Sequence, residues 1–227
     1  MVNTVGSLET KHWQRNLITF KRALIITSEQ RALLIGSLLG DGTMWLGKKG
    51  RNVNYKVEQG LEQKEYVFWK YIILKSLVLT EPKISYRYNA LREKYPKSWW
   101  FRTVRHPLFT EIYTLWYTGN GYRGGKKIVP KTIGDDLTPL ALAVWIMDDG
   151  SYSKGTITIS TYSFDLSEIA LLQQVISERY GIRFLVHRDR DKGYRMNANQ
   201  RETRALVNII APYIIPSMMY KIGFKTP

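Results

Sequence analysis

Two aspartates of this sequence could hold a metal ion together. Asp41 and Asp149 each follow a run of apolar residues, each precede a glycine, and lie 108 positions apart. A helix C-terminus already carries about half a negative charge, so an ionised Asp there is unfavourable. If the two runs are parallel, adjacent helices, the carboxylates meet and need a cation between them. Oxygen ligands favour Mg²⁺ over Zn²⁺. One Asp-Gly pair would indicate only a turn, but its repetition favours a metal site.

The two apolar runs carry the capping residues of helices. Thr27, with Gln30 three residues later, predicts the start of a helix whose apolar body is residues 32–39. Thr138-Pro139 predicts the start of a second helix with the apolar body 140–147. Each run ends at the Asp-Gly pair. Because both bodies are apolar on nearly every side, we expect buried helices packed against other elements, or against each other.

The patterns after each helix follow one order, which predicts that the chain runs twice through helix, hairpin, helix, hairpin, helix. In the first pass these are strands up to residue 61, a helix over 63–78, strands over 83–89 and 98–105, and a helix over 108–117. In the second they are a strand over 155–161, a helix opened by a capping box of Asp165 and Glu168, strands over 183–190 and 193–199, and a helix from Asn199.

The charge points to a polyanionic partner. Of 227 residues, 34 are Lys or Arg and 19 are Asp or Glu, for a net charge of +15. Residues 1–133 hold 23 of the basic and 9 of the acidic residues, whereas residues 134–227 hold 11 and 10. Aromatic residues, 13% of the chain, alternate with the basic ones, which indicates a folded nucleic-acid surface rather than a disordered basic arm. We expect the first half to supply most nonspecific phosphate contacts, and the second relatively more shape and base contacts.

Composition excludes several kinds of site. The sequence has no Cys, which excludes disulfides and thiolate zinc sites. His12, His106 and His187 are widely separated, which argues against a histidine metal cluster. No apolar run reaches the ~18–20 residues of a membrane span, and the first residues lack the pattern of a secretory signal. We expect an intracellular protein that is not secreted and has no membrane partner; organelle and prokaryotic cytoplasm both stay open.

The residues around the two aspartates resemble a known motif. LIGSLLGDG at 34–42 and LAVWIMDDG at 142–150 are similar to the two copies of the LAGLIDADG motif in single-chain homing endonucleases. The resemblance extends in order over nearly all of the chain after the N-terminal extension, residues 1–27. It implies an α+β fold of two pseudo-symmetric αββαββα repeats, residues 28–137 and 138–227. Their antiparallel sheets would form a saddle over double-stranded DNA.

The resemblance also implies metal ligands. Asp41 and Asp149 would be catalytic carboxylates that hold divalent ions, with help from the backbone carbonyls of Gly40 and Asp148. The Asp148 side chain receives no role, because Gly40 fills the same slot in the first motif. The cofactor would be Mg²⁺, as two or more ions, with Mn²⁺ as a substitute and Ca²⁺ supporting binding without cleavage.

Lys127 and Lys221 match the basic residues beside the two sites of this family, which implies a catalytic role. A lysine there can offset charge on the transition state. Contact with the phosphate backbone, or plain surface charge, is the alternative for each.

Basic residues on the predicted strands and loops are the candidates for DNA contact, because every second side chain of a strand faces one side of its sheet. Over residues 83–89, one register presents Lys83, Ser85, Arg87 and Asn89 and the other presents Ile84, Tyr86 and Tyr88; both stay open. Arg188 and Arg190 would share a face. The candidates are Lys48, Lys49, Arg51, Lys56, Lys83, Arg87, Arg102, Arg105, Arg188, Arg190, Lys192 and Arg195.

The implied activity is metal-dependent cleavage of both strands of a long asymmetric DNA target by a monomer, leaving short 3′ overhangs. The alternative is an intron-encoded RNA maturase that assists group I splicing, with or without DNA cleavage. A DNA-binding regulator without cleavage is a third hypothesis, which the two intact aspartates disfavour.

Overall fold

The computed structural model describes residues 17–47, 51–119 and 125–224. Lys48 and Lys49, two of the predicted DNA contacts, lie outside these ranges. The described chain runs twice through a helix, two strands, a helix, two strands and a helix. The predicted α+β class and element order are therefore confirmed.

The first half of the molecule comprises the elements between residues 28 and 116, and the second half those between residues 139 and 222. A helical stretch over residues 17–22 precedes the elements of the first half, which are α2 (Ser28–Leu39), β1 (Thr43–Trp45), β2 (Asn54–Gly60), η1 (Leu61–Gln63), α3 (Lys64–Leu74), η2 (Lys75–Leu77), β3 (Lys83–Tyr88), β4 (Lys94–Arg102) and α4 (Pro107–Trp116). After α5 (Ile133–Asp136) come α6 (Pro139–Asp149), β5 (Gly150–Ser153), β6 (Thr156–Ser160), α7 (Leu166–Tyr180), β7 (Leu185–Arg188), β8 (Tyr194–Ala198), α8 (Gln200–Ile210), η3 (Ala211–Tyr213) and η4 (Pro216–Ile222).

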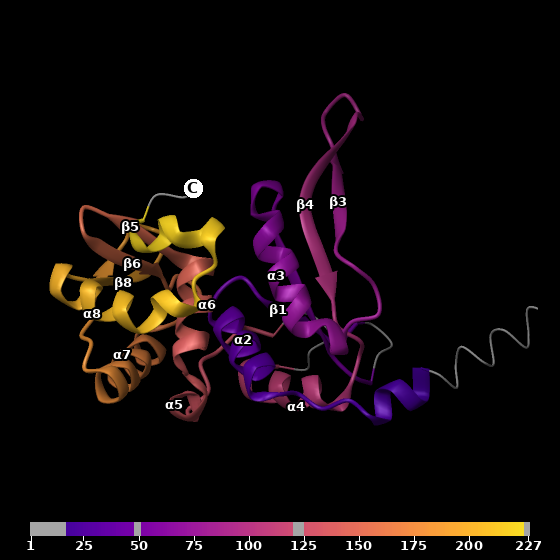
Figure 1. Ribbon diagram of the computed structural model, residues 1–227, viewed down its shortest axis with the longest axis horizontal. Helices are drawn as coiled ribbons and strands as arrows, with labels where there is room; N and C mark the ends of the chain where they lie inside the picture. Colours follow the sequence, from indigo (N-terminus) through magenta and orange to yellow (C-terminus); the bar gives the residue numbers. More distant parts are fainter. Residues whose placement is uncertain (1–16, 48–50, 120–124, 225–227) are drawn as a thin grey trace, which may run out of the picture.

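Helices α2 and α6 lie side by side between the two halves (Figure 1). Thr27 caps α2 in the predicted capping box, in which the Thr27 hydroxyl accepts a hydrogen bond from the backbone N–H of Gln30. Gly36 allows the close approach of the two helices, because a Cβ there would lie 2.2 Å from the Ala141 carbonyl oxygen. This contact fixes how far apart the two helix ends can be.

The two helices end differently, which the sequence did not predict. Helix α2 ends at Leu39, with Gly40 as its cap, so that Asp41 lies beyond the helix. Helix α6 continues through Asp149, two residues past the predicted end of its body, and Gly150 caps it. The reason is the residue in the shared slot, because glycine leaves a helix more readily than Asp148 does.

In the part of the chain that the structure describes, each half contains one four-stranded antiparallel sheet. The strand orders are β1-β2-β4-β3 and β5-β6-β8-β7, so the two sheets have the same topology. Strands β3 and β4 extend as a long hairpin beyond the rest of the first half (Figure 1). One hydrophobic core runs through both halves, and Trp145 of α6 is fully buried in it. Within the described ranges, no helix has the length and apolar character needed to span a membrane.

Candidate metal and nucleic-acid site

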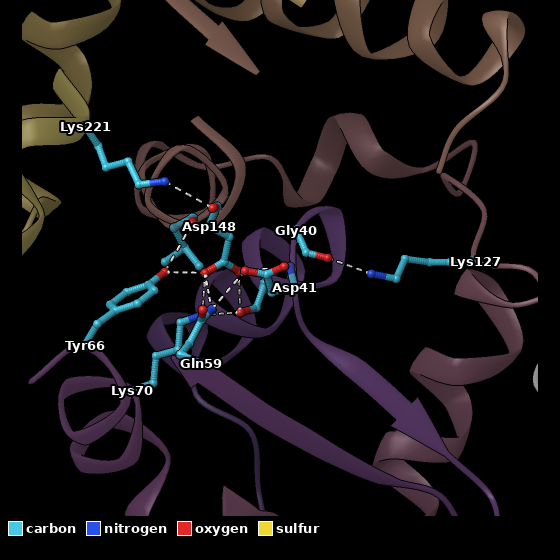
Figure 2. A network of polar contacts seen from close by, with 10 residues as sticks. Gly40, Asp41, Gln59, Tyr66, Lys70, Lys127, Asp148 and Lys221 are labelled. Carbon is cyan, nitrogen blue, oxygen red and sulfur yellow. Dashed lines mark hydrogen bonds and ion pairs between the residues drawn. The ribbon is translucent and has the colours of Figure 1, made fainter. Parts of the chain in front are cut away.

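The two predicted metal ligands lie at the neighbouring C-terminal ends of α2 and α6. The backbone N–H of Asp41 donates to Asp148 Oδ2 across the helix pair, at 3.3 Å (Figure 2). Gly40 leaves the room for this contact, because a Cβ at Gly40 would lie 2.5 Å from the Asp148 Cβ. Asp149, the last residue of α6, is half-buried beside them. The expected meeting of two helix ends that carry carboxylates is therefore present.

The carboxylates of this site repel one another, which disfavours their ionised forms. Burial, and after it the negative charges of Asp41 and Asp148, raise the pKa of Asp149 to about 7. Burial and the charge of Asp148 also raise the pKa of Asp41, which a hydrogen bond from Gln59 partly opposes. A divalent cation between Asp41 and Asp149 would relieve this repulsion.

The donor set fits Mg²⁺ that is shared with a ligand. In the described ranges, no group of three or more His, Cys, Asp or Glu side chains is placed to hold a metal ion. The site offers two carboxylates next to backbone carbonyls, all of them hard oxygen donors. Mg²⁺ usually keeps water and binds through one or two carboxylates together with substrate phosphates. The arrangement therefore suits a metal ion completed by a phosphodiester.

Lys127 and Lys221 reach the two helix ends from opposite sides (Figure 2). Lys127 Nζ donates to the Gly40 carbonyl at 2.7 Å. Lys221 Nζ donates to the Gly150 carbonyl at 2.8 Å and to the Asp148 carbonyl at 3.3 Å. Burial lowers the pKa of both lysines, although the nearby aspartates oppose the shift. Neither lysine is plain surface charge, and both lie beside the carbonyls predicted to assist the metal.

Four residues that the sequence prediction passed over complete the site. Lys70 and Tyr66 of α3, Gln59 of β2 and Ser37 of α2 all donate to the carboxylate of Asp148. The signal in the sequence was Lys70, a charged residue in the middle of an otherwise apolar helical run. Its partner could not be read from spacing, because Asp148 is 78 residues away.

The open face of the first sheet is charged. Lys83 pairs with Trp100, which also pairs with Glu58 of β2, so these residues share the face opposite the core. Lys83 and Ser85 therefore face outward. The pairing of β3 with β4 shifts register between Ser85 and Tyr86, and beyond this point Tyr86, Arg87 and Tyr88 are all exposed, while Asn89 follows the end of β3. Predicted contacts Lys56 and Arg102 pair with each other on the same face.

Glu58 sits among these cations. Its carboxylate accepts hydrogen bonds from Lys56, Lys97 and Ser98. Burial alone would raise the pKa of Glu58, but these bonds lower it to about 2. Glu58 therefore stays ionised and orders the lysines around it.

The open face of the second sheet is lined mainly by small polar side chains. The register of β5, β6 and β8 aligns Ser151, Thr158 and Asn197, and places Arg195 beside Ser160. Arg195, a predicted contact, also faces outward next to His187. This face has fewer long cations than that of the first sheet.

The remaining candidate contacts lie outside the regular strand faces. Arg188 is the last residue of β7 and pairs with Tyr194, in the alternate register to Arg195. Arg190, in the turn after β7, has φ of 45°, and the alternation of the strand does not reach it. The prediction that Arg188 and Arg190 share one strand face is therefore wrong. Lys192 lies in the same turn and is exposed.

Arg51 and Arg105 flank the first sheet. Arg51 is exposed in a bend before β2. Arg105 donates to the Leu46 carbonyl at 2.9 Å and its guanidinium lies over the Trp45 ring. The guanidinium of Arg105 is thus already held by protein contacts.

Comparison with known proteins gives a consistent picture. Residues 31–206 match the LAGLIDADG DNA endonuclease family. The chain is 31% identical over 212 residues to the cytochrome b mRNA maturase bI2 of Debaryomyces hansenii, covering 92% of this chain and 78% of that protein. It is 30% identical to the DNA endonuclease I-ChuI of Chlamydomonas applanata, covering 87% and 96%. The homing endonuclease I-WcaI, solved with its DNA recognition sequence, has the same fold, with a TM-score of 0.81 at 22% identity over 92% of each chain.

Proposed function

Because the chain belongs to the LAGLIDADG DNA endonuclease family, we propose that it is a site-specific endonuclease that cuts both strands of a long asymmetric DNA target. Short 3′ overhangs are the expected product. The observation that carries the proposal is the convergence of Asp41 and Asp149, one from each half, between Lys127 and Lys221. A protein that only bound DNA would gain nothing from two mutually repelling carboxylates beside phosphates.

The proposed cofactor is Mg²⁺. Asp41 and Asp149 would hold it, with the backbone carbonyls of Gly40 and Asp148 as further oxygen donors. An ion held there would supply a lower pKa for an attacking water and positive charge to offset that of the scissile phosphate and the leaving oxygen. I-DmoI, a protein of similar fold, has been solved with DNA in the presence of Mn²⁺ and of Ca²⁺, which supports a divalent ion.

The two lysines would stabilise negative charge on a bound phosphate. Each ammonium group lies beside one helix end and within reach of a phosphate bound there. Because both lysines are partly buried, their attraction for developing negative charge is screened less than it would be in water. The role proposed for Lys127 and Lys221 is stabilisation of the transition state, one lysine for each strand.

The two open sheet faces would hold the duplex as a saddle. In this proposal the protein acts as a monomer, with residues 28–137 and 138–227 as its two repeats and residues 1–27 as an extension. The basic contacts of both sheets, with Arg51 and Arg105 beside them, would follow the phosphate backbone on either side of the cleavage position.

Cleavage of a supercoiled plasmid tests the proposal. The target would be the junction of the exons that flank the gene, if the gene lies within an intron. With Mg²⁺, the protein should linearise this plasmid, whereas Asp41→Asn and Asp149→Asn should abolish cleavage and retain DNA binding in Ca²⁺. Asp135→Asn, an exposed acid at α5, is the matched control and should cleave normally. Undiminished cleavage by either site variant would refute the assignment.

A second function is favoured by one observation. The Debaryomyces hansenii relative, 31% identical to this chain, is named as a maturase of cytochrome b mRNA. RNA maturation, with or without DNA cleavage, is therefore the alternative, and group I intron splicing with and without the protein tests it. No stimulation at any Mg²⁺ concentration would rule this alternative out.

A further inference from the structure

Beneath the two helix ends lies a buried ion pair that the proposed chemistry does not use. Lys70 Nζ lies 2.7 Å from Asp148 Oδ1, and the two side chains are 1% and 0% exposed (Figure 2). The ammonium also donates to Ser37 Oγ at 2.7 Å and lies over the Tyr66 ring. Burying two charges is expensive unless every partner is in place. Such a pair is thus retained only where its geometry is complete.

The Asp148 carboxylate is fully engaged by the protein. Its Oδ1 accepts from Lys70, Tyr66 and Gln59, and its Oδ2 accepts from Ser37 Oγ and the Asp41 N–H. With five donors around it, this side chain has no room to ligate a metal ion. It instead ties α3, β2 and the end of α2 to the end of α6.

Two of these contacts lead directly to Asp41. The Asp41 N–H donates to Asp148 Oδ2 at 3.3 Å. Gln59 Nε2 bridges from Asp148 Oδ1, at 3.3 Å, to Asp41 Oδ2, at 3.1 Å. Both the backbone and the carboxylate of Asp41 are therefore held through Asp148, and Asp148 is held through Lys70.

Asp149 has no comparable support. Among the described residues, its side chain accepts no hydrogen bond. In the second motif Trp145 takes the position that Ser37 has in the first, and in the first motif Gly40 takes the position that Asp148 has in the second. The second motif thus cannot build the same network toward the first. The two carboxylates of one site are positioned by different means.

We propose that Lys70 and Asp148 are positioning residues for Asp41, and that cleavage of the two DNA strands depends on them unequally. This inference rests on the proposed nuclease function for its second part only. The first part, the placement of Asp41, is a property of the free protein.

The first measurement requires no cleavage. Lys70→Met keeps the length of the side chain and removes its charge. In amide hydrogen exchange followed by NMR, the Asp41 N–H should exchange about tenfold or more faster in this variant, since its acceptor is no longer ordered. The Asp149 N–H, which lies within α6, should keep its wild-type rate. An unchanged Asp41 rate would overturn the placement of Asp41 by this pair, whether or not the protein is a nuclease.

The second measurement resolves the two strands. A target duplex labelled on one strand or the other gives a single-turnover rate constant for each at saturating Mg²⁺. In Lys70→Met, the ratio of the rate constants for the two strands should differ from that of wild type by about 10- to 100-fold, because one strand is cut more slowly. Small misplacements at a reacting centre reduce rates by this much. Nicked plasmid should accumulate. Equal slowing of both strands, or no slowing, would overturn the second part.

Two further variants separate positioning from stability. Leu74→Ala makes a cavity in the same helix without touching the network, so it should lower thermal stability and leave both the strand ratio and the Asp41 exchange rate unchanged. Lys70→Met combined with Asp148→Ala leaves no unpaired buried charge and should fold. Because Asp148→Ala removes the acceptor of the Asp41 N–H and of Gln59, this double variant should show the same unequal cleavage as Lys70→Met.

Discussion

The two sheets of this protein have the same strand order and different open faces. The first carries long cations and aromatic rings, with Lys56, Lys83 and Arg102 around Glu58 and Trp100. The second carries mainly hydroxyl and amide groups, and Arg195 is a cation on its strands. One topology therefore supports two kinds of surface, because only the outward side chains differ.

This contrast suggests a division of labour in DNA binding. Long cations act on phosphates at a distance and with little regard to sequence. Short hydroxyl and amide groups act only in direct or water-bridged contact, where base edges differ. The first half would supply most of the nonspecific phosphate contacts, and the second half would contribute relatively more to discrimination between DNA sequences.

The largest expected effect is on affinity. Replacing Lys83, Arg87 and Arg102 with Gln should weaken DNA binding by roughly tenfold for each phosphate left without its cation, and should flatten the log–log salt slope by about 0.9 for each. Titrations at several salt concentrations measure both quantities. The matched control, Gln at Arg183, Arg201 and Arg204, removes equal charge away from the open sheet faces and should leave the slope nearly unchanged. An equal weakening in both triple variants would mean that net charge alone matters.

A second prediction concerns discrimination. Thr158→Val and Asn197→Leu on the second sheet should reduce preference for the target over single-base variants by about 1–3 kcal/mol at the positions they contact. The salt slope should stay that of wild type, since no charge is removed. Competition binding against a panel of substituted targets gives these numbers. Uniform weakening across the panel would contradict the proposed division of labour.

The third prediction uses the unequal support of Asp41 and Asp149. The folded-state pKa of Asp149 is about 7, against an ordinary value of 3.8. Folding thus favours the protonated form of Asp149. Its contribution to the free energy of unfolding is fully present below the pKa of Asp149 in the unfolded chain and is lost as pH rises through about 7. Asp149→Asn should therefore raise the free energy of unfolding of the metal-free protein by about 1–2 kcal/mol near pH 8, and by little near pH 4.

Urea denaturation in EDTA across this pH range measures the difference between wild type and Asp149→Asn. Asp41→Asn is the informative comparison, because the hydrogen bond from Gln59 opposes the rise in the pKa of Asp41 and should make the effect of this substitution smaller. A larger effect at Asp41 than at Asp149 would contradict the inference that the protein supports the Asp41 carboxylate better than the Asp149 carboxylate.

The smallest expected effect is at Glu58. Glu58→Gln should strengthen nonspecific DNA binding by up to about tenfold, because it releases Lys56 and Lys97 from their two ion pairs with Glu58 and removes a negative charge from the face. Since the pKa of Glu58 is about 2, wild-type binding should show no Glu58 titration at ordinary pH. Weaker binding by the variant would instead indicate that Glu58 itself contacts the DNA.

Much of the architecture could be predicted because its signals are local. The capping boxes at Thr27 and Asp165 act over three residues, so the predicted helix starts are the observed ones. The two Asp-Gly pairs, at the ends of apolar helices, indicated where a metal site would form. Each of these inferences uses residues that are neighbours in the chain.

Other features depended on contacts that spacing does not encode. Strand alternation over residues 83–89 allowed two registers of equal quality, and only pairing with β4 selected the one that turns Lys83 outward. Arg188 and Arg190 were predicted to share one strand face, but β7 ends at Arg188 and Arg190 lies in the turn that follows. The sequence assigned no role to the side chain of Asp148, which the fold surrounds with five donors.

The sequence by itself determined the order of the elements, the two apolar helices and the two aspartates at their ends, since caps, periodicity and charge act over a few residues. Only the tertiary structure decided which lysine meets which carbonyl, and that Lys70 neutralises Asp148. These partners are 71 to 87 residues apart. Their meeting depends on how closely α2 and α6 pack, and that distance is set by Gly36 and Gly40 against the opposite helix.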